Sequence, residues 1–312
     1  MTKPKIEKFS KEAFFDAKEI AVYENRTYSS VTNHFTKKTE TLGLDVYAPN
    51  PKRRGNIKFP LIVFAHGGAF QGGDKKVFQK TCFELSKRGF VAATINYRVG
   101  WNERREYGKH RGDSWDLLRA WYNGVQDMNT AIQTLIAQLP VIDANQVFVG
   151  GSSAGATMAL GISYIRQKDV DSWRPEYRRL YGELRKKEMP NFKVKGCISM
   201  WGAMLSTKAM NNNIPALFLH GTADKAVPFD NDFYLKCHIY PKLRGARPIA
   251  RKLEELNVPY HFYAKKGADH GHTFWTAKEK NMALINFLNQ AMNGNVRKTV
   301  KVLRYTPKAE LV

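Results

Sequence analysis

The chain alternates short, almost wholly apolar runs with longer stretches of helical periodicity. The clearest apolar runs cover residues 61–65, 90–95, 146–149, 194–200, 216–219 and 260–263. Runs that are apolar at nearly every position suit strands that are covered on both faces, as in a parallel sheet. Between them, residues 76–88 and 117–138 have the three- and four-residue apolar spacing of amphipathic helices. The alternation predicts an α/β fold, with a mostly parallel central sheet and helices on both faces.

The rest of the chain fits this plan. Residues 19–23 and 39–47 suit an earlier pair of strands, and the sequence contains no internal repeat. The charged stretch around 166–190 follows a predicted core helix and precedes a strand, so we interpret it as a basic helical insertion over the surface. A chain of 312 residues can bury one large core, and a single domain spanning residues 1–312 is the simplest prediction.

The formal net charge of +22 is high for a chain of this length. It suits a polyanionic partner, such as nucleic acid, an anionic membrane surface or an acidic polysaccharide. No nucleic-acid-binding motif accompanies it, so we expect no nucleic-acid partner. A solvated basic surface is the alternative interpretation. The denser patches are Arg104, Arg105, Lys109 and Arg111, then Arg174, Arg178, Arg179, Arg185, Lys186 and Lys187, then Arg297, Lys298, Lys301, Arg304 and Lys308.

The sequence also bears on location and redox chemistry. Its apolar runs are strand-sized and fall well short of the roughly 18 residues that a membrane-spanning helix needs. The N-terminal stretch has no continuous apolar segment, so we expect a cytoplasmic protein, or an exported one whose signal was already removed.

Cys82 and Cys197 lie in patterns typical of buried free thiols, whereas Cys237 could be exposed.

Glycine-rich and polar motifs follow four of the predicted strands. They are HGGAF at 66–70, GGSSAGA at 150–156, HGTAD at 220–224 and GADHGH at 267–272. Ligand sites in parallel sheets lie beyond the carboxyl ends of the strands. The four motifs are therefore expected to meet at one edge of the sheet.

Gly151, Ser153 and Gly155 match the pattern G-x-S-x-G, in which a serine occupies a sharp turn between a strand and a helix. The flanking residues must be small because the strand and helix backbones pass close together there. This spacing predicts Ser153 as a nucleophile and leaves Ser152 as its neighbour. A purely structural Gly/Ser turn is the alternative, and a phosphate-binding loop is disfavoured because no Lys-Ser/Thr pair follows the glycines.

A serine hydroxyl attacks a carbonyl only with an imidazole base, and that imidazole needs a carboxylate to orient it. Asp224 and His270 follow Ser153 in the required order, each just after a predicted strand. The competing candidates are Asp230 and Asp232 for the acid, and His272 for the base.

The remaining histidines suggest no metal centre. His66 and His220 stand at strand ends within turn motifs, where a hydrogen-bonded structural role is the favoured interpretation. A metal site at His270 and His272 is disfavoured because no carboxylate or cysteine partner has ligand spacing. The predicted chemistry needs no cofactor.

On these motifs, together with LDVYAP (44–49), INYRVG (95–100) and WGA (201–203), the sequence resembles the α/β-hydrolase superfamily. It is most similar to carboxylesterases, including acetyl xylan and feruloyl esterases and the hormone-sensitive-lipase-like esterases. The resemblance covers roughly residues 40–290. It implies that the backbone amides of Gly68, Ala69 and Ala154 form an oxyanion hole. The chain departs from the family pattern at Ala69, in the basic insertion and at His272.

Aromatic residues gather near the inferred mouth of the site. Phe70, Trp101, Trp201 and Phe274 are candidate pocket residues, with Trp115 and Trp275 nearby in the pattern. Ordinary packing is the alternative to an aromatic-lined acyl or alcohol pocket.

The resemblance implies a serine carboxylesterase that cleaves short-acyl or feruloyl-type esters, on small molecules or on plant polysaccharide. A peptidase or lipase with the same three residues is one alternative. A hydrolase-fold protein that binds polyanions is the other. Oligomeric state is not determined by the sequence.

Overall fold

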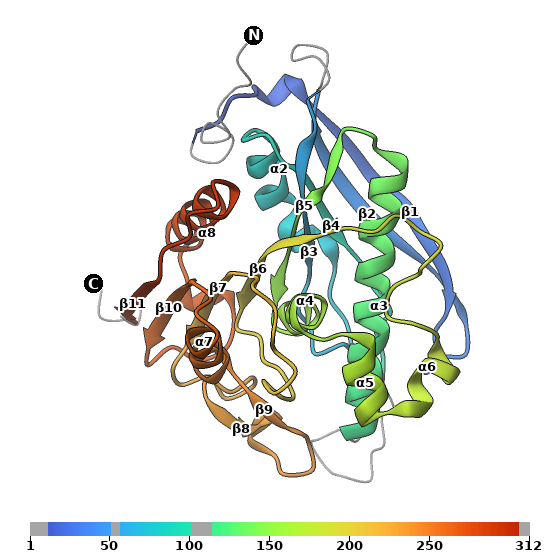
Figure 1. Ribbon diagram of the computed structural model, residues 1–312, viewed down its shortest axis with the longest axis vertical. Helices are drawn as coiled ribbons and strands as arrows, with labels where there is room; N and C mark the ends of the chain where they lie inside the picture. Colours follow the sequence, from blue (N-terminus) through green and yellow to red (C-terminus); the bar gives the residue numbers. More distant parts are fainter. Residues whose placement is uncertain (1–11, 51–56, 102–113, 306–312) are drawn as a thin grey trace.

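The computed structural model describes residues 12–50, 57–101 and 114–305 (Figure 1). The first basic patch, Arg104, Arg105, Lys109 and Arg111, and also Lys308, lie outside the described residues. Within the described ranges, no helix is both long and apolar enough to cross a membrane.

A nine-stranded sheet forms the centre of the described chain, in the order β1-β2-β4-β3-β5-β6-β7-β10-β11. Its strands are β1 (Ile20–Thr32), β2 (Thr39–Pro49), β3 (Phe59–Ala65), β4 (Val91–Ile95), β5 (Ile142–Ser152), β6 (Val194–Met200), β7 (Ala216–Gly221), β10 (Tyr260–Lys266) and β11 (Thr299–Arg304). The pairs β1–β2 and β2–β4 are antiparallel, and the remaining neighbours are parallel. The mostly parallel sheet and the early antiparallel pair are therefore confirmed.

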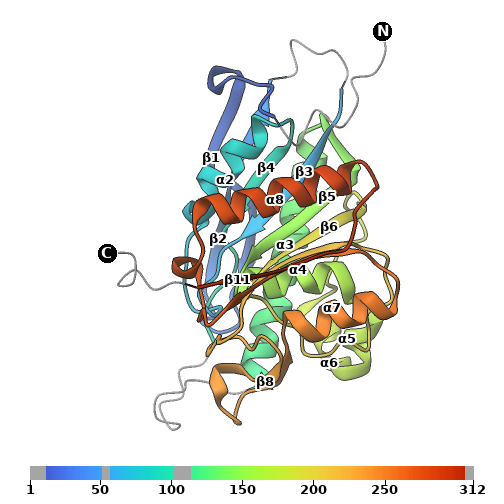
Figure 2. The ribbon, with the colours of Figure 1, turned by 90° about the vertical axis from the view of Figure 1, so that its left-hand side faces the viewer.

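Helices cover both faces of this sheet. They are α2 (Gln79–Ser86), α3 (Ser114–Gln138), α4 (Ala154–Tyr164), α5 (Gln167–Trp173), α6 (Pro175–Tyr181), α7 (Ala246–Glu255) and α8 (Ala277–Met292). Figure 2 shows α2 and α8 together over one face, while α3 and α4 pack against each other on the opposite face. Short 3-10 turns occur at Ala17–Glu19, Lys75–Phe78, Tyr234–Lys236 and His272–Phe274, and a small two-stranded sheet pairs β8 (Asn231–Phe233) with β9 (Lys242–Arg244).

The order of the strands determines where a site can form. β3 and β5 are neighbours, but the connection that follows β3 runs to β4 on one side, whereas the connection that follows β5 runs to β6 on the other. In parallel sheets such a switch point opens a crevice at the carboxyl ends of the strands. Here the crevice lies between the loop after β3, which carries HGGAF, and the turn after β5, which carries Ser153.

Some elements differ from the sequence-based expectation. The helix expected at 76–88 is a 3-10 turn followed by α2, and α7, α8 and β11 were not expected. β11 is an edge strand whose Val300 and Val302 are exposed. A strand of this kind has no continuous apolar run in its sequence, so the pattern that marked the central strands did not reveal it.

The basic insertion is helical only in its first half. α5 ends at Trp173 and α6 at Tyr181, and residues 182–193 contain neither helix nor strand. Polar side chains of α3 donate hydrogen bonds to carbonyls of this segment, which are therefore satisfied without a helix. These bonds join Tyr122 to Gly182 (2.5 Å), Gln126 to Glu183 (3.0 Å), Asn129 to Leu184 (2.9 Å) and Gln133 to Lys186 (2.7 Å).

The core is tightest where β3, β5 and α4 meet. A Cβ atom added to Gly155 would lie 2.1 Å from the carbonyl oxygen of Ala65, and one added to Gly151 would lie 2.5 Å from the same oxygen. The two glycines of the G-x-S-x-G pattern are thus required by close backbone approach. Cys82 and Cys197 are buried free thiols in this core, as expected.

We predict that Gly155→Ala lowers the free energy of unfolding by about 1–3 kcal/mol, because the added methyl group overpacks the junction. The loss should appear although alanine favours helix by about 1 kcal/mol over glycine. Urea denaturation followed by circular dichroism measures it. Gly72→Ala is the matched control, since an added Cβ there meets nothing within 4 Å. Equal stability of the two variants would contradict the prediction.

Candidate active site

Ser153 lies at the turn between β5 and α4, with backbone angles φ 52° and ψ −117°. A non-glycine residue in this region costs on the order of 1–3 kcal/mol, so the surrounding structure must hold it there. The amide of Ser153 donates to the carbonyl of Met200 (2.9 Å), and Gly151 and Gly155 admit the close backbone packing. The strained turn leaves the Ser153 hydroxyl free to face the crevice.

His270 and Asp224 complete a chain of hydrogen bonds with Ser153. The Oγ of Ser153 lies 3.0 Å from Nε2 of His270, and Nδ1 of His270 lies 2.7 Å from Oδ2 of Asp224. Because the carboxylate can only accept, Nδ1 carries the proton and Nε2 is left to accept the serine proton. The three residues thus form a path along which a proton can leave the hydroxyl.

Asp224 is 2% exposed, accepts three hydrogen bonds and has Nε2 of His220 at 3.2 Å from Oδ2. The amides of Ala226 and Val227 donate to Oδ1, and Nδ1 of His270 donates to Oδ2. Burial alone would raise the pKa of this carboxyl, but the interactions with the two histidines outweigh it and lower the pKa to about 2. The carboxylate is therefore charged throughout the neutral range.

His220 is the site residue whose contact the sequence did not reveal. We expected a structural, hydrogen-bonded histidine, and its Nε2 does lie 3.1 Å from the carbonyl of Val227. The same nitrogen lies 3.2 Å from Oδ2 of Asp224, so His220 also contacts the carboxylate that orients His270. The spacing of the two residues within HGTAD was the only indication available.

The loops that carry Asp224 and His270 are bonded to each other. Oδ1 of Asp269 accepts from the amides of His270 (2.7 Å) and Lys225 (2.8 Å), and the amide of Ala223 donates to the carbonyl of Ala268 (3.0 Å). These bonds link the two loops and so fix the distance between Asp224 and His270, without using the side chain of either residue.

The competing candidates lie elsewhere. Asp230 pairs with Arg247, and Asp232 pairs with Lys236, both at the surface. His272 opens a 3-10 turn and lines a cavity, but no hydrogen bond joins it to Ser153 or Asp224. Ser152 ends β5 and packs beside Gly67, as a neighbour of Ser153.

The loop after β3 lies against the serine turn. A Cβ atom added to Gly67 would come within 3.2 Å of the Cβ of Ser153. Gly68, Ala69 and Phe70 all have positive φ angles, and the carbonyl of Gly68 accepts from the amide of Gln71 (2.8 Å) to close the turn. The alanine in HGGAF therefore adopts a conformation that glycine would adopt more readily.

Ala154 is the first residue of α4, and Ala69 and Ala154 line the same cavity as Ser153. Amides in the first turn of a helix have no partner within the helix, and the helix dipole favours negative charge beside them. This placement suits Gly68, Ala69 and Ala154 to receive an oxyanion next to the serine.

Residues from INYRVG, and Trp101 directly after this motif, support the loop. The hydroxyl of Tyr97 donates to the carbonyl of His66 (2.9 Å), and Nε1 of Trp101 donates to the carbonyl of Ala69 (3.0 Å). Arg98 forms a buried ion pair with Asp127 of α3, at 2.7 Å, which anchors this support to the helix. Trp101, a candidate pocket residue, is not among the described residues that line either cavity at Ser153, and its indole braces this loop instead.

His66 is buried and stacks on Tyr97 with ring centroids 4.4 Å apart. Burial lowers the pKa of its imidazole, partly opposed by the hydrogen bond between Nδ1 and the carbonyl of Gly67. The contacts are those of a structural histidine. Among the described residues, no group of three potential ligands from His, Cys, Asp and Glu could hold a metal ion.

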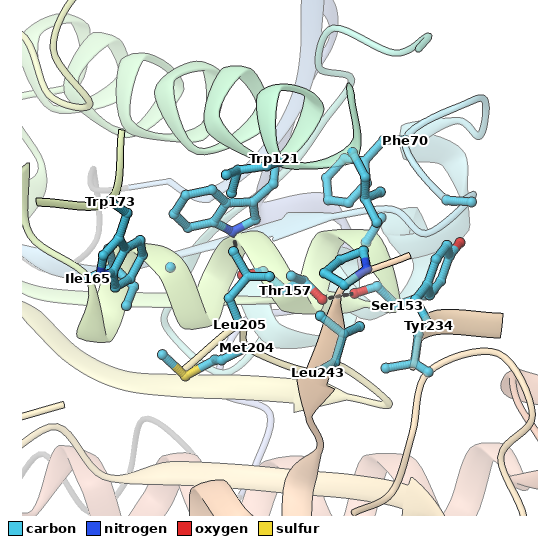
Figure 3. Close-up of a pocket in the computed structure, with 17 residues that line it drawn as sticks. Phe70, Trp121, Ser153, Thr157, Ile165, Trp173, Met204, Leu205, Tyr234 and Leu243 are labelled. Atoms are coloured by element: carbon cyan, nitrogen blue, oxygen red, sulfur yellow. Dashed lines mark hydrogen bonds between the residues drawn. The ribbon is translucent and has the colours of Figure 1, made fainter. Parts of the chain in front are cut away.

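Two cavities open from Ser153. The first is narrow and apolar, with a volume of about 60 Å³, and Phe70 lines it as predicted. Figure 3 shows Ser153 and Tyr234 at one end and Ile165 and Trp173 at the other. Ser153, Thr157, Gly161 and Ile165 follow one another at four-residue steps, so this cavity runs along one face of α4.

The second cavity is wide, about 690 Å³, and both His270 and Trp201 line it. Its wall is mostly apolar but includes four charged residues: Asp74, Lys80, Glu84 and Lys280. Phe274, the remaining pocket candidate, lines neither cavity. It packs instead on Tyr305 with ring centroids 5.0 Å apart, because the 3-10 turn at His272–Phe274 directs it toward β11.

Comparison with protein families gives two matches. The model of the prolyl oligopeptidase family matches residues 77–295, and the model named BD-FAE matches residues 44–107. The first match extends over more than half of the chain and includes Ser153, Asp224 and His270.

Curated relatives are distant and much longer. A dipeptidyl-aminopeptidase B of Ajellomyces capsulatus is 27% identical over 78% of this chain and 25% of its own length. The neuroligin-like protein glit-1 of Caenorhabditis elegans is 31% identical over 38% of this chain and 15% of its own. Fumonisin B1 esterase of Sphingopyxis macrogoltabida is 30% identical over 39% of this chain and 22% of its own. The chain spans a quarter or less of the length of these relatives.

Among solved structures, native esterase 2 of Thermogutta terrifontis is 20% identical, with a TM-score of 0.56 over 89% of this chain and 92% of that chain. The same esterase phosphonylated by cyclosarin is 21% identical, with a TM-score of 0.57 over 86% of this chain and 91% of that chain. At this level of identity the likeness establishes the fold alone.

The lowered pKa of Asp224 predicts a specific dependence of stability on pH. A fall from the ordinary 3.8 to about 2 corresponds to about 2 kcal/mol of stability. That contribution is complete above pH 4 and is lost as the pH falls through about 2. Asp224→Asn lacks it, so the wild type's advantage in free energy of unfolding should shrink by about 2 kcal/mol from pH 5 to pH 2. Urea unfolding across this range measures the gap, and a constant gap would contradict the prediction.

Proposed function

The chain belongs to the prolyl oligopeptidase family and is a serine hydrolase of the α/β-hydrolase fold, and we propose that it cleaves carboxylic esters through an acyl-enzyme. The observation that carries this proposal is the hydrogen-bonded chain of Ser153, His270 and Asp224 at the mouth of an uncharged, apolar cavity.

In the proposed reaction, Oγ of Ser153 attacks the ester carbonyl while Nε2 of His270 takes the serine proton. Asp224 accepts the hydrogen bond from Nδ1–H of His270 and stabilises the charged imidazole that forms. The amides of Gly68, Ala69 and Ala154 receive the negative oxygen of the tetrahedral intermediate, and loss of one such donor typically slows a reaction about 100- to 1000-fold. His270 then protonates the departing alcohol, and water releases the acid in a second, equivalent cycle.

The two cavities suggest how the ester is oriented. The departing alcohol takes its proton from His270, so it must leave on the side that His270 lines, which is the wide cavity. The acyl group then occupies the narrow cavity, which contains Ser153, Ala69 and Ala154 but not His270. A volume of about 60 Å³ is roughly that of a few water molecules and suits a short acyl chain. The charged residues in the wall of the wide cavity would hydrogen-bond an alcohol that carries hydroxyl groups, such as a sugar, while its apolar part would contact the sugar ring.

The peptidase alternative is less well supported by the narrow cavity. An enzyme that removes dipeptides from a free amino terminus must accept a charged ammonium group on the acyl side. Burying such a charge without a carboxylate partner is costly. The described residues that line the narrow cavity include no Asp and no Glu.

We predict that Ser153→Ala lowers the hydrolysis of p-nitrophenyl acetate at least about 10⁴-fold and abolishes covalent labelling by a fluorophosphonate, because both need the nucleophile. Ser30→Ala, at an exposed position of β1, is the control and should keep both properties. Intact-mass spectrometry reads the label. Labelling of Ser153→Ala at the wild-type rate would contradict the assignment of the nucleophile.

The narrow cavity also predicts acyl selectivity. Acetyl to butyryl esters should have kcat/KM at least about tenfold above the octanoyl ester, because a longer chain must displace packed side chains. Leu205→Ala, in the wall of the cavity, should raise the octanoyl-to-acetyl ratio about tenfold, whereas Leu180→Ala, exposed on α6, should not change it.

The measurement is a series of p-nitrophenyl esters, with methyl ferulate, acetylated xylan and an aminoacyl-prolyl anilide beside it. Equal rates for all chain lengths would contradict the acyl assignment. Preferred cleavage of the anilide would favour the peptidase alternative.

A further inference from the structure

A third cavity, of about 540 Å³, lies between α3, the carboxyl-terminal end of α4 and the segment that follows α6. Figure 1 shows α5, α6 and the chain beyond them on the α3 side of the molecule. Ile165 lines both this cavity and the far end of the narrow cavity. Twelve residues of helix separate Ile165 from Ser153, about 18 Å at the rise of an α-helix, so the reacting serine is remote from this site.

The wall of the third cavity is basic. Among the described residues that line it, Glu183 is the only acidic one. Four lining residues are cationic: Arg166, Arg185, Lys186 and Lys187. Arg166 pairs with Asp169 (2.9 Å), and Lys187 pairs with Glu183 (3.0 Å). Within the described part of the chain, no carboxylate pairs with Arg185 or Lys186. Two cations therefore remain without a counter-charge.

Arg185 is the more unusual of the two. Its guanidinium lies 3.8 Å from the centre of the Phe192 ring, and Nη1 donates to Oδ1 of Asn191 (2.9 Å). The stacking leaves the side chain half-buried, and burial lowers the pKa of the guanidinium, so its charge is held at a cost. A bound anion would offset that cost through charge-assisted hydrogen bonds.

The cavity is also rigid. The polar side chains of α3 hold the backbone of 181–186 at fixed positions, so the basic side chains start from an ordered segment. One member of this row, Asn129, is 3% exposed and gives its Nδ2 to Leu184 and Val125. Its Oδ1 is also buried and has no hydrogen-bond partner among the described residues, so this oxygen faces the protein interior and not the cavity.

We propose that this cavity binds a small anionic molecule, whose carboxylate or phosphate group pairs with Arg185 and Lys186. A neutral sugar lacks the charge that these two cations require. The site does not depend on Ser153, so it stands or falls separately from the proposed esterase activity.

Isothermal titration calorimetry on the full chain tests the proposal, with digalacturonate, glucose 6-phosphate, xylobiose and inorganic phosphate as titrants. We expect at least one of the three anions to bind at least about tenfold more tightly than xylobiose. Comparison of digalacturonate with glucose 6-phosphate shows whether the carboxylate or the phosphate is the preferred acidic group.

Arg185→Gln and Lys186→Gln should each weaken this binding at least about tenfold, while the hydrolysis of p-nitrophenyl acetate is unchanged. Lys186 is exposed, so its substitution tests the site even if Arg185→Gln is unstable. Arg179→Gln removes the same charge from an exposed position of α6 outside the cavity and should leave the affinity unchanged.

Three results would overturn the proposal. The first is the absence of binding by all three anions. The second is equally tight binding of xylobiose, which would remove the need for the charge. The third is an equal loss of affinity in Arg179→Gln, which would indicate diffuse attraction by the basic surface.

Discussion

The close approach of β3, β5 and α4 is the constraint on which the rest of the structure depends. Gly151 and Gly155 both face the carbonyl of Ala65, and no side chain fits between them. This contact bends the chain at Ser153 into a positive φ, and it also brings the loop after β3 against the same turn. A single packing requirement therefore places the serine hydroxyl and the amides that could stabilise an oxyanion next to each other.

The acid and base are positioned by a different kind of interaction. Asp224 accepts three hydrogen bonds and lies beside His220, so the carboxylate has one stable orientation and stays ionised without solvent. The bonds that Asp269 makes to two neighbouring loops then fix His270 relative to it. Rigid electrostatic positioning of this kind reduces the reorganisation that a reaction needs. His220 contributes to it from a fully buried position.

The basic insertion shows how a charged stretch can be ordered without a helix of its own. α3 is apolar toward the sheet, but a row of buried polar side chains on its other side binds the carbonyls of the insertion. The backbone of the insertion is thereby satisfied, and its basic side chains are held around a cavity instead of being dispersed in solvent. Part of the high net charge thus has a defined place in the fold.

The sequence alone determined the layered α/β architecture, because apolar runs and helical spacing follow directly from burial on two faces or on one. It also indicated Ser153, Asp224 and His270, since each follows a strand within a motif of fixed spacing. The tertiary structure decided what no local pattern encodes. It placed His220 beside Asp224, made Trp101 a support for the HGGAF loop, and directed Phe274 away from both cavities. These outcomes depend on contacts between segments distant in sequence, where packing decides which side chains face a cavity.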